Sequence, residues 1–317
     1  MTPPPVTAQL VTSSPETAPL VIVGPTASGK SDVAMAYSGT HPGAEIIAVD
    51  AMQVYRRMDI GTAKPTTADR AAVPHHCIDL CEPSDDCTVA QFVDRARVAL
   101  AGVAERGGAA VLVAGTGLYL RAITDPMEIP GRWPDVRARL EARGEVEGAA
   151  ALHAELATLD PVAASRMEPG NLRRVVRALE VTLGSGRAFS SFGPGIGTYP
   201  PVVFRQVGLQ WPRPVLAQRI AERVHRMVAA GLVQEVEALL AAPGGLSRTA
   251  AQALGYKEVI DHLEGRCGLD EAIESVIVRT RQFAVRQERW FRRDPRVRWV
   301  SIEHDPVAEV LPALADA

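Results

Sequence analysis

The sequence has no apolar run of the roughly 18 residues that a membrane-spanning helix requires. Its first 18 residues are rich in proline, threonine and serine, and they lack the apolar stretch of a signal peptide. We therefore expect residues 1–18 to form a disordered tail. We also expect a soluble, cytoplasmic protein with no membrane partner.

Cysteine is scarce, since the chain has four: Cys77, Cys81, Cys87 and Cys267. The first three are spaced C-x3-C and C-x5-C, and they lack the paired C-x2-C knuckles of zinc sites. Intracellular proteins keep most thiols reduced. We therefore predict free thiols in place of a zinc site.

Lysine is rarer than arginine, because only Lys30, Lys64 and Lys257 are lysines among 34 basic residues. An ammonium group and a guanidinium group are not interchangeable, so these three positions are candidates for specific roles. The net charge of −3 gives no indication of a nucleic-acid partner. The 317 residues, 47% of them hydrophobic, are enough for two domains or for one domain with an insertion.

The most informative stretch is residues 24–31, which follow the apolar run 20–23 and precede a helical pattern. It matches G-x-x-x-x-G-K-[S/T] in the strand, loop, helix context of a phosphate-binding loop. In such a loop the backbone N–H groups and the helix N-terminus converge on phosphate oxygens. We expect Lys30 to add charge and Ser31 to bind Mg²⁺. The alternative is a glycine-rich turn without a ligand. The expected phosphate-binding residues are Gly24, Pro25, Thr26, Ala27, Ser28, Gly29, Lys30 and Ser31.

A second apolar strand is predicted at residues 44–49, and Asp50 stands at its carboxyl end. Ligands of open α/β sheets bind at the carboxyl ends of strands, so Asp50 is expected to face the phosphate loop. Its carboxylate could accept a proton or hold Mg²⁺ through water. The alternative is a helix cap or turn former.

The alternation of strands and helices predicts an α/β protein, in which a phosphate-loop parallel sheet is flanked by helices and carries a small all-helical insertion. Residues 130–197 contain helical patterns and no strand, so we assign them to the insertion. The catalytic core is expected at 19–129 and 198–303, and 304–317 is expected to be a tail. Further helices are expected at 88–104, 214–230, 233–241, 249–263 and 271–293, and further strands at 109–113, 201–209 and 297–302.

Two helical segments, one in the insertion and one near the end of the catalytic core, are rich in arginine. Residues 171–181 place Arg173, Arg174 and Arg177 off the apolar face. Residues 279–293 carry six arginines against one glutamate, interleaved with aromatic residues, which suits a phosphodiester backbone and unstacked bases. The alternative is two solvated helix surfaces.

Taken together, the motifs resemble those of the tRNA dimethylallyltransferases, in the order and at the approximate spacing of that family. The matching stretches are GPTASGKS (24–31), DAMQVYRRMDIGTAKPT (50–66), PHHCID (74–79), AGTGLYLRA (114–122), RRVVRALEV (173–181), ALGYKE (253–258) and RTRQFAVRQERWFRR (279–293).

The resemblance implies transfer of a dimethylallyl group from dimethylallyl diphosphate to N6 of adenosine 37 of a tRNA, with release of diphosphate. Asp50 would be the base, and Thr26 would orient the reaction or supply a second hydrogen bond. Lys30, Arg223 and Mg²⁺ near Ser31 and Asp50 would stabilise the leaving group.

The resemblance also implies a monomer whose helical insertion clamps the anticodon stem-loop, and it places Gln53 as a reader of the flipped base. Ala51, Cys77 and Arg173 depart from the family's usual serine, leucine and glutamine, but none removes a group that the chemistry needs. The implied tRNA contacts are Asp50, Ala51, Met52, Gln53, Thr116, Arg137, Arg173, Arg174, Arg177, Gln252, Gly255, Tyr256, Lys257, Arg286, Gln287, Arg289 and Arg292.

Two other functions compete with this one. A phosphotransferase acting on a nucleoside or small molecule would explain the phosphate loop and Asp50, but not the arginine-rich helices. A non-enzymatic RNA-binding ATPase would not need a carboxylate that faces the loop.

Overall fold

The computed structural model describes residues 18–193 and 195–315, so the predicted tail lies outside the described residues apart from Ala18. Contacts divide the chain into two compact units, Asp125–Pro200 and the remainder, and the insertion was predicted at 130–197. Among the described residues, no helix combines the length and the apolar character needed to cross a membrane.

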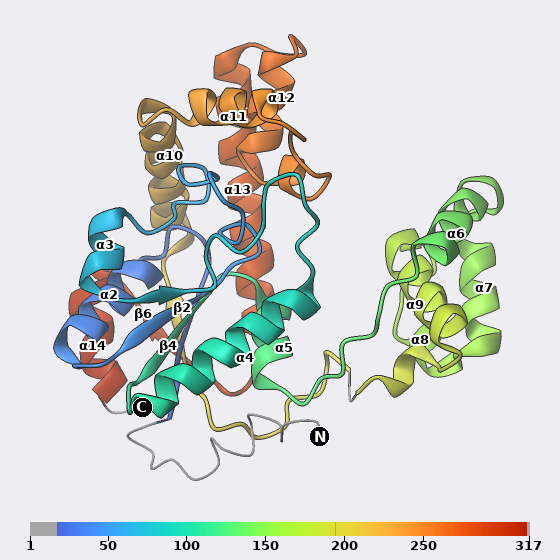
Figure 1. The fold of residues 1–317 in the computed structure, drawn as a ribbon, viewed down its shortest axis with the longest axis horizontal. Helices are drawn as coiled ribbons and strands as arrows, with labels where there is room; N and C mark the ends of the chain where they lie inside the picture. Colours follow the sequence, from blue (N-terminus) through green and yellow to red (C-terminus); the bar gives the residue numbers. More distant parts are fainter. Residues whose placement is uncertain (1–17, 194, 316–317) are drawn as a thin grey trace. The chain divides into compact units, whose positions relative to one another are not determined.

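A six-stranded parallel sheet forms the centre of the larger unit (Figure 1). Its spatial order is β3-β2-β4-β1-β5-β6. Strands β1, β2 and β4 are apolar and almost wholly buried, as expected for a parallel sheet covered on both faces. The predicted α/β fold class is confirmed. The strands are β1 (Leu20–Val23), β2 (Glu45–Val49), β3 (His75–His76), β4 (Ala110–Ala114), β5 (Arg205–Gln210) and β6 (Val297–Ser301).

The register aligns the carboxyl ends of the central strands. Val23 of β1 and Val49 of β2 both pair with Ala114 of β4. The residues that follow these strands therefore leave the sheet along one edge, as the sequence predicted for the phosphate loop and Asp50.

Helices cover both faces of the sheet. Thr88 begins α4 with a capping box, in which its hydroxyl accepts from the N–H of Gln91. Right-handed crossovers place α2 and α4 on opposite faces (Figure 1). The helices of this unit are α2 (Lys30–Thr40), α3 (Thr67–Ala72), α4 (Val89–Glu105), α5 (Gly117–Thr124), α10 (Arg213–Ala229), α11 (Leu232–Ala241), α12 (Tyr256–Leu263), α13 (Leu269–Phe291) and α14 (Pro306–Ala315).

The smaller unit is built from helices, and its described residues contain no strand. It buries its own core, which includes Leu140, Leu152, Leu156, Val175 and Leu179. Its helices are α6 (Pro134–Glu147), α7 (Ala149–Leu159), α8 (Pro161–Ser165) and α9 (Leu172–Ser185), with a short 3-10 turn η2 (Phe189–Ser191).

The predicted helix 249–263 is interrupted. The 3-10 turn η3 (Ala250–Gln252) comes first, and α12 begins only at Tyr256. Gly255 between them has φ +90°, a left-handed conformation that glycine adopts most readily and that an α-helix does not contain. The predicted strand 201–209 likewise begins only at Arg205.

The predicted tail 304–317 is wrong as a description of this segment, because most of it forms α14. Val310 and Leu314 are buried in the core that α2 shares, and their burial outweighs Pro312 inside the helix. Pro306 also lies against the phosphate loop, since a Cβ added at Gly29 would be 2.6 Å from Pro306 Cγ.

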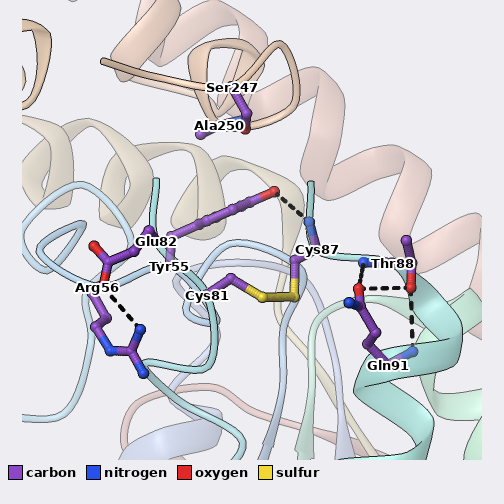
Figure 2. Close-up of a disulfide and its surroundings, with 9 residues drawn as sticks. All are labelled: Tyr55, Arg56, Cys81, Glu82, Cys87, Thr88, Gln91, Ser247 and Ala250. Carbon is purple, nitrogen blue, oxygen red and sulfur yellow. Dashed lines mark hydrogen bonds and ion pairs between the residues drawn. A yellow bond between two sulfur atoms is a disulfide. The ribbon is translucent and has the colours of Figure 1, made fainter. Parts of the chain in front are cut away.

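The prediction of free thiols is wrong for two cysteines. Cys81 and Cys87 form a disulfide in the loop between β3 and α4 (Figure 2). Tyr55 aligns this loop, because it pairs with Cys81 in an isolated β-bridge and its hydroxyl accepts from the N–H of Cys87 at 3.5 Å. The spacing of the cysteines alone did not reveal the pairing. Cys77 and Cys267 are free.

We predict that Leu314→Ala lowers the free energy of unfolding by about 2–5 kcal/mol, because it opens a cavity in the core under α14. Denaturant titration measures the change. Leu263→Ala is the matched control, because Leu263 is 37% exposed, and it should shift stability by no more than about 0.5 kcal/mol. Equal effects of the two substitutions would show that α14 does not belong to the core.

Candidate active site

A cavity of about 420 Å³ lies where the ends of β1, β2 and β4 meet. Its wall brings together groups that the sequence analysis predicted from separate stretches. The phosphate loop supplies 26–31, β2 supplies Asp50, and α10 supplies Arg223. Gln53, Gly115 and Gln287 complete the side of the cavity around Asp50.

The phosphate loop is fixed from outside by three side chains. The indole N–H of Trp211 donates to Ser28 O at 3.0 Å, and Arg219 Nε donates to Ala27 O at 3.0 Å. Arg219 also stacks over the Trp211 ring, with 4.4 Å from Cζ to the ring centroid. The third is Gln287, whose Oε1 accepts from the N–H of Thr26 at 2.8 Å. The loop is therefore held in place by protein contacts alone.

Two cations share this cavity. Burial, together with the positive charge of Arg223, lowers the pKa of Lys30 to about 7, and Asp50 opposes the shift. Burial also lowers the pKa of Arg223, with Asp50 again acting in the opposite direction. Lys30 Nζ donates to Pro25 O at 2.7 Å. An anion bound here would relieve the repulsion between the two cations and restore the charge of Lys30.

Asp50 uses its two oxygens differently. Oδ1 accepts from the N–H groups of Met52 (2.8 Å) and Gln53 (3.3 Å), so it holds the turn that follows β2. Oδ2 lies towards Gly115, 3.3 Å from the position that a Cβ on that glycine would occupy. The turn-forming and cavity-facing roles that the sequence left open are thus both present. Thr116 supports the same turn, because its hydroxyl accepts from the N–H of Ala51 at 3.2 Å.

The loop after Asp50 is organised around a buried lysine. Lys64 Nζ donates to Tyr55 O and to Asp79 Oδ1, each at 2.7 Å. Gln53 Nε2 donates to the carbonyls of Thr62 and Ala63, each at 3.1 Å. Lys64 therefore organises this loop, and it lines the same cavity as Lys30.

The predicted RNA contacts divide by exposure. Arg286 and Arg289 on α13 and Arg292 directly after it are exposed, as are Gln252 and, in the smaller unit, Arg173 and Arg174. Arg137, Arg177 and Lys257 are half-buried and paired, the two arginines with Glu180 and Lys257 with Asp261.

Two of the predicted RNA contacts are buried side chains. Tyr256 is 0% exposed, and its hydroxyl donates to Glu235 Oε1 at 2.5 Å. Gln287 is 7% exposed. Helical spacing could have predicted the burial of Gln287, because this residue lies three residues after Ala284 and four before Phe291, which are both buried.

The sequence analysis did not predict that Trp211 and Arg219 hold the phosphate loop. Arg219 stands one helical turn before Arg223 on α10, and this spacing was the available signal. Trp211 follows the end of β5. The sequence alone did not show that β5 pairs with β1, and this pairing brings Trp211 next to the phosphate loop.

The residues present fit a magnesium ion. Ser31 and Asp50 both line the cavity and offer hydroxyl and carboxylate oxygens, which are hard donors. Across the described chain, no group of three or more His, Cys, Asp or Glu side chains forms a metal cage. The hydroxyl and carboxylate oxygens of Ser31 and Asp50 suit Mg²⁺, which keeps water ligands and is held largely by substrate phosphates.

A parallel sheet with a phosphate loop at the end of β1 and a carboxylate at the end of β2 defines a P-loop α/β protein. The family model described as IPP transferase matches residues 53–294, and the one described as isopentenyl transferase matches 19–75. The chain belongs to the tRNA dimethylallyltransferase family, as its motifs predicted.

Relatives and solved structures agree on this family. The tRNA dimethylallyltransferase of Kineococcus radiotolerans is 50% identical over 289 residues, covering 89% of this chain and 90% of that protein. The Streptomyces coelicolor enzyme of the same name is 47% identical, covering 91% and 92%. The crystal structure of a tRNA isopentenylpyrophosphate transferase from Bacillus halodurans matches with a TM-score of 0.65 at 38% identity, covering 95% and 96%. A eukaryotic dimethylallyltransferase acting on tRNA matches with a TM-score of 0.74 at 25% identity, covering 89% and 73%.

We predict that the protein takes up protons when it binds inorganic diphosphate at pH 8. Lys30, with a pKa of about 7, is mostly neutral at that pH, and the bound anion raises its pKa. Isothermal titration calorimetry in buffers of different ionisation enthalpy counts the protons. Lys30→Arg is the control, because its guanidinium is always charged, and it should take up fewer protons. The same proton count in both proteins would contradict the site's electrostatics.

Proposed function

We propose that this protein transfers the dimethylallyl group of dimethylallyl diphosphate to N6 of adenosine 37 in a tRNA, next to the anticodon, and releases diphosphate. The observation that carries the proposal is the single cavity in which Lys30 and Arg223 lie with Asp50 at the end of the phosphate loop. The two cations would stabilise the charge of a leaving diphosphate, and the carboxylate would accept a proton from the attacking amine.

The proposed chemistry follows from these groups. The exocyclic amine of adenine is a weak nucleophile, because its lone pair is delocalised into the ring. Asp50 takes the proton of this amine as the C–N bond forms, and the Thr26 hydroxyl orients the reacting groups. Lys30, Arg223 and the N–H groups of the loop stabilise the charge that builds on diphosphate as the allylic C–O bond breaks. A magnesium ion held by Ser31, Asp50 and the phosphates would add charge neutralisation there.

RNA recognition is proposed to involve both units. The exposed arginines of α13 contact the phosphodiester backbone, and Arg137, Arg173, Arg174 and Arg177 of the smaller unit contact the anticodon stem-loop. Adenosine 37 leaves its stack to reach the cavity, at a cost of a few kcal/mol that is small in a single-stranded loop. Gln53, whose Nε2 is held by backbone carbonyls, presents Oε1 to the amine of this base. We propose that the protein acts as a monomer in the cytoplasm.

The test of this function is transfer of label from dimethylallyl diphosphate to an anticodon stem-loop RNA with adenosine at position 37. We expect label in the RNA and one diphosphate released per group transferred, without ATP. An RNA with guanosine at that position is the control. Appearance of phosphate on an acceptor, dependent on ATP, would favour the phosphotransferase instead.

We predict that Asp50→Asn lowers turnover by about 10²-fold or more, because the amide cannot take the proton of the amine. The Asn side-chain oxygen can still accept from Met52 and Gln53, so RNA affinity should change little. Single-turnover transfer and RNA binding are measured together. Asp32→Asn is the matched control, because Asp32 lines the same cavity without facing Gly115, and it should retain most of the activity. A parallel loss of RNA affinity in Asp50→Asn would make Asp50 a recognition residue.

We predict that Arg286→Ala weakens RNA binding and reduces the slope of log K against log salt by about 1, because one phosphate contact is lost. Arg95→Ala on α4 is the matched control, since Arg95 is exposed but lies outside α13. Fluorescence anisotropy over a range of salt concentrations measures both slopes. An unchanged slope for Arg286→Ala would make α13 an ordinary solvated helix.

A further inference from the structure

Gln287 is the one point at which α13 is seen to hydrogen-bond the phosphate loop within the described chain. Its Oε1 accepts from the N–H of Thr26 at 2.8 Å, and its Nε2 donates to Gly115 O at 2.7 Å. The side chain is 7% exposed. One amide therefore connects the loop after β1 to the loop after β4.

This connection lies beside the proposed base. The position of a Cβ on Gly115 would be 3.3 Å from Asp50 Oδ2 and 3.4 Å from Gln287 Nε2. The carboxylate and the amide therefore face the same small volume above Gly115. A displacement of Gln287 would change both the placement of the Thr26 N–H and the backbone that borders Asp50.

A second contact fits α13 to the start of α5, directly after the same loop. One helical turn after Gln287, the Trp290 ring packs so closely on Gly117 that a Cβ there would clash with it. α13 is thus matched to the loop at Gly115 and to the first residue of α5 at Gly117. A shift of the helix would be passed directly to the loop, because packed interiors transmit small displacements.

The other faces of α13 carry the exposed arginines. Arg286 and Arg289 are exposed while Gln287 between them is buried, so the helix has its charged faces towards solvent and its amide towards the cavity. RNA bound to those arginines would restrict the position of α13. Through Gln287, α13 would in turn restrict the position of the phosphate loop.

We propose that Gln287 is a positioning residue that couples RNA binding on α13 to the geometry of the phosphate loop. The inference rests on the proposed function and deepens it. It means that RNA increases the affinity of the loop for diphosphate, and that diphosphate increases the affinity for RNA by the same factor. It also replaces the predicted role of Gln287 as a direct RNA contact.

The chemistry of the side chain explains why an amide is needed. Thr26 offers a donor and Gly115 an acceptor, and only a group with one acceptor and one donor satisfies both. Glutamate has the same shape, but its carboxylate has two acceptors and no donor. It would therefore be repelled by Gly115 O and by the Asp50 carboxylate. Methionine has a similar length and would leave both backbone groups without their partner.

The experiment measures the affinity of inorganic diphosphate with Mg²⁺, with and without a saturating anticodon stem-loop RNA that has adenosine at position 37. The full chain is used in three variants: Gln287→Glu, Gln287→Met and the control Gln282→Met. Gln282 lies on the same helix and is exposed. We expect RNA to tighten diphosphate binding by at least about fivefold in the wild type and in the control. In both Gln287 variants the factor should fall below about twofold.

Thermal unfolding of each variant separates coupling from stability. A residue with only a structural role would lower the melting temperature and leave the RNA effect on diphosphate unchanged, and this result would overturn the proposal. Absence of the RNA effect in the wild type would also overturn it. If Gln287→Met does not fold, the isosteric Gln287→Glu provides the answer. The readout needs no prenyl transfer, so a failure of the proposed function is detected separately by the transfer assay.

Discussion

The electrostatic constraint on which the site depends is the placement of two half-buried cations, Lys30 and Arg223, in the wall of one cavity. Burial lowers the pKa of each group, and the positive charge of Arg223 lowers the pKa of Lys30 further. Asp50 offsets part of this repulsion. Perturbed pKa values of this kind cluster at functional sites, and the proposed diphosphate would supply the negative charge that offsets the two cations. The arrangement supports the proposal that this site binds a leaving anion beside a carboxylate that accepts a proton.

The rest of the larger unit holds these groups in position. The parallel register brings the ends of β1, β2 and β4 to one edge, so the loop, Asp50 and Gly115 meet without long connections. Trp211 and Arg219 fix the loop from one direction, and Gln287 fixes it from another. These contacts tie the phosphate loop to α10, to α13 and to the residue that follows β5.

Sequence patterns predicted the sheet, the phosphate loop and the place of Asp50, because apolar runs and strand ends are local features. They failed where a residue's role depends on a distant partner. The hydrogen bonds of Gln287 and Tyr256 to Thr26, Gly115 and Glu235 were not visible in the sequence, and the RNA contacts predicted for these two residues stay predictions. The Cys81–Cys87 disulfide lies in a loop that pairs with Tyr55, a neighbour that the cysteine spacing does not reveal. The terminal helix α14 was missed because its stability comes from tertiary burial, and its own sequence contains a proline.

The measurement that tests the central claim most directly is a crystal structure of the protein with inorganic diphosphate, Mg²⁺ and an anticodon stem-loop RNA. The account predicts diphosphate on the N–H groups of residues 26–31 and an unstacked adenine 37 whose N6 lies about 2.6–3.2 Å from the Asp50 carboxylate. An adenine that stays stacked in the RNA, or that enters the protein away from Asp50 while diphosphate occupies the loop, would contradict it.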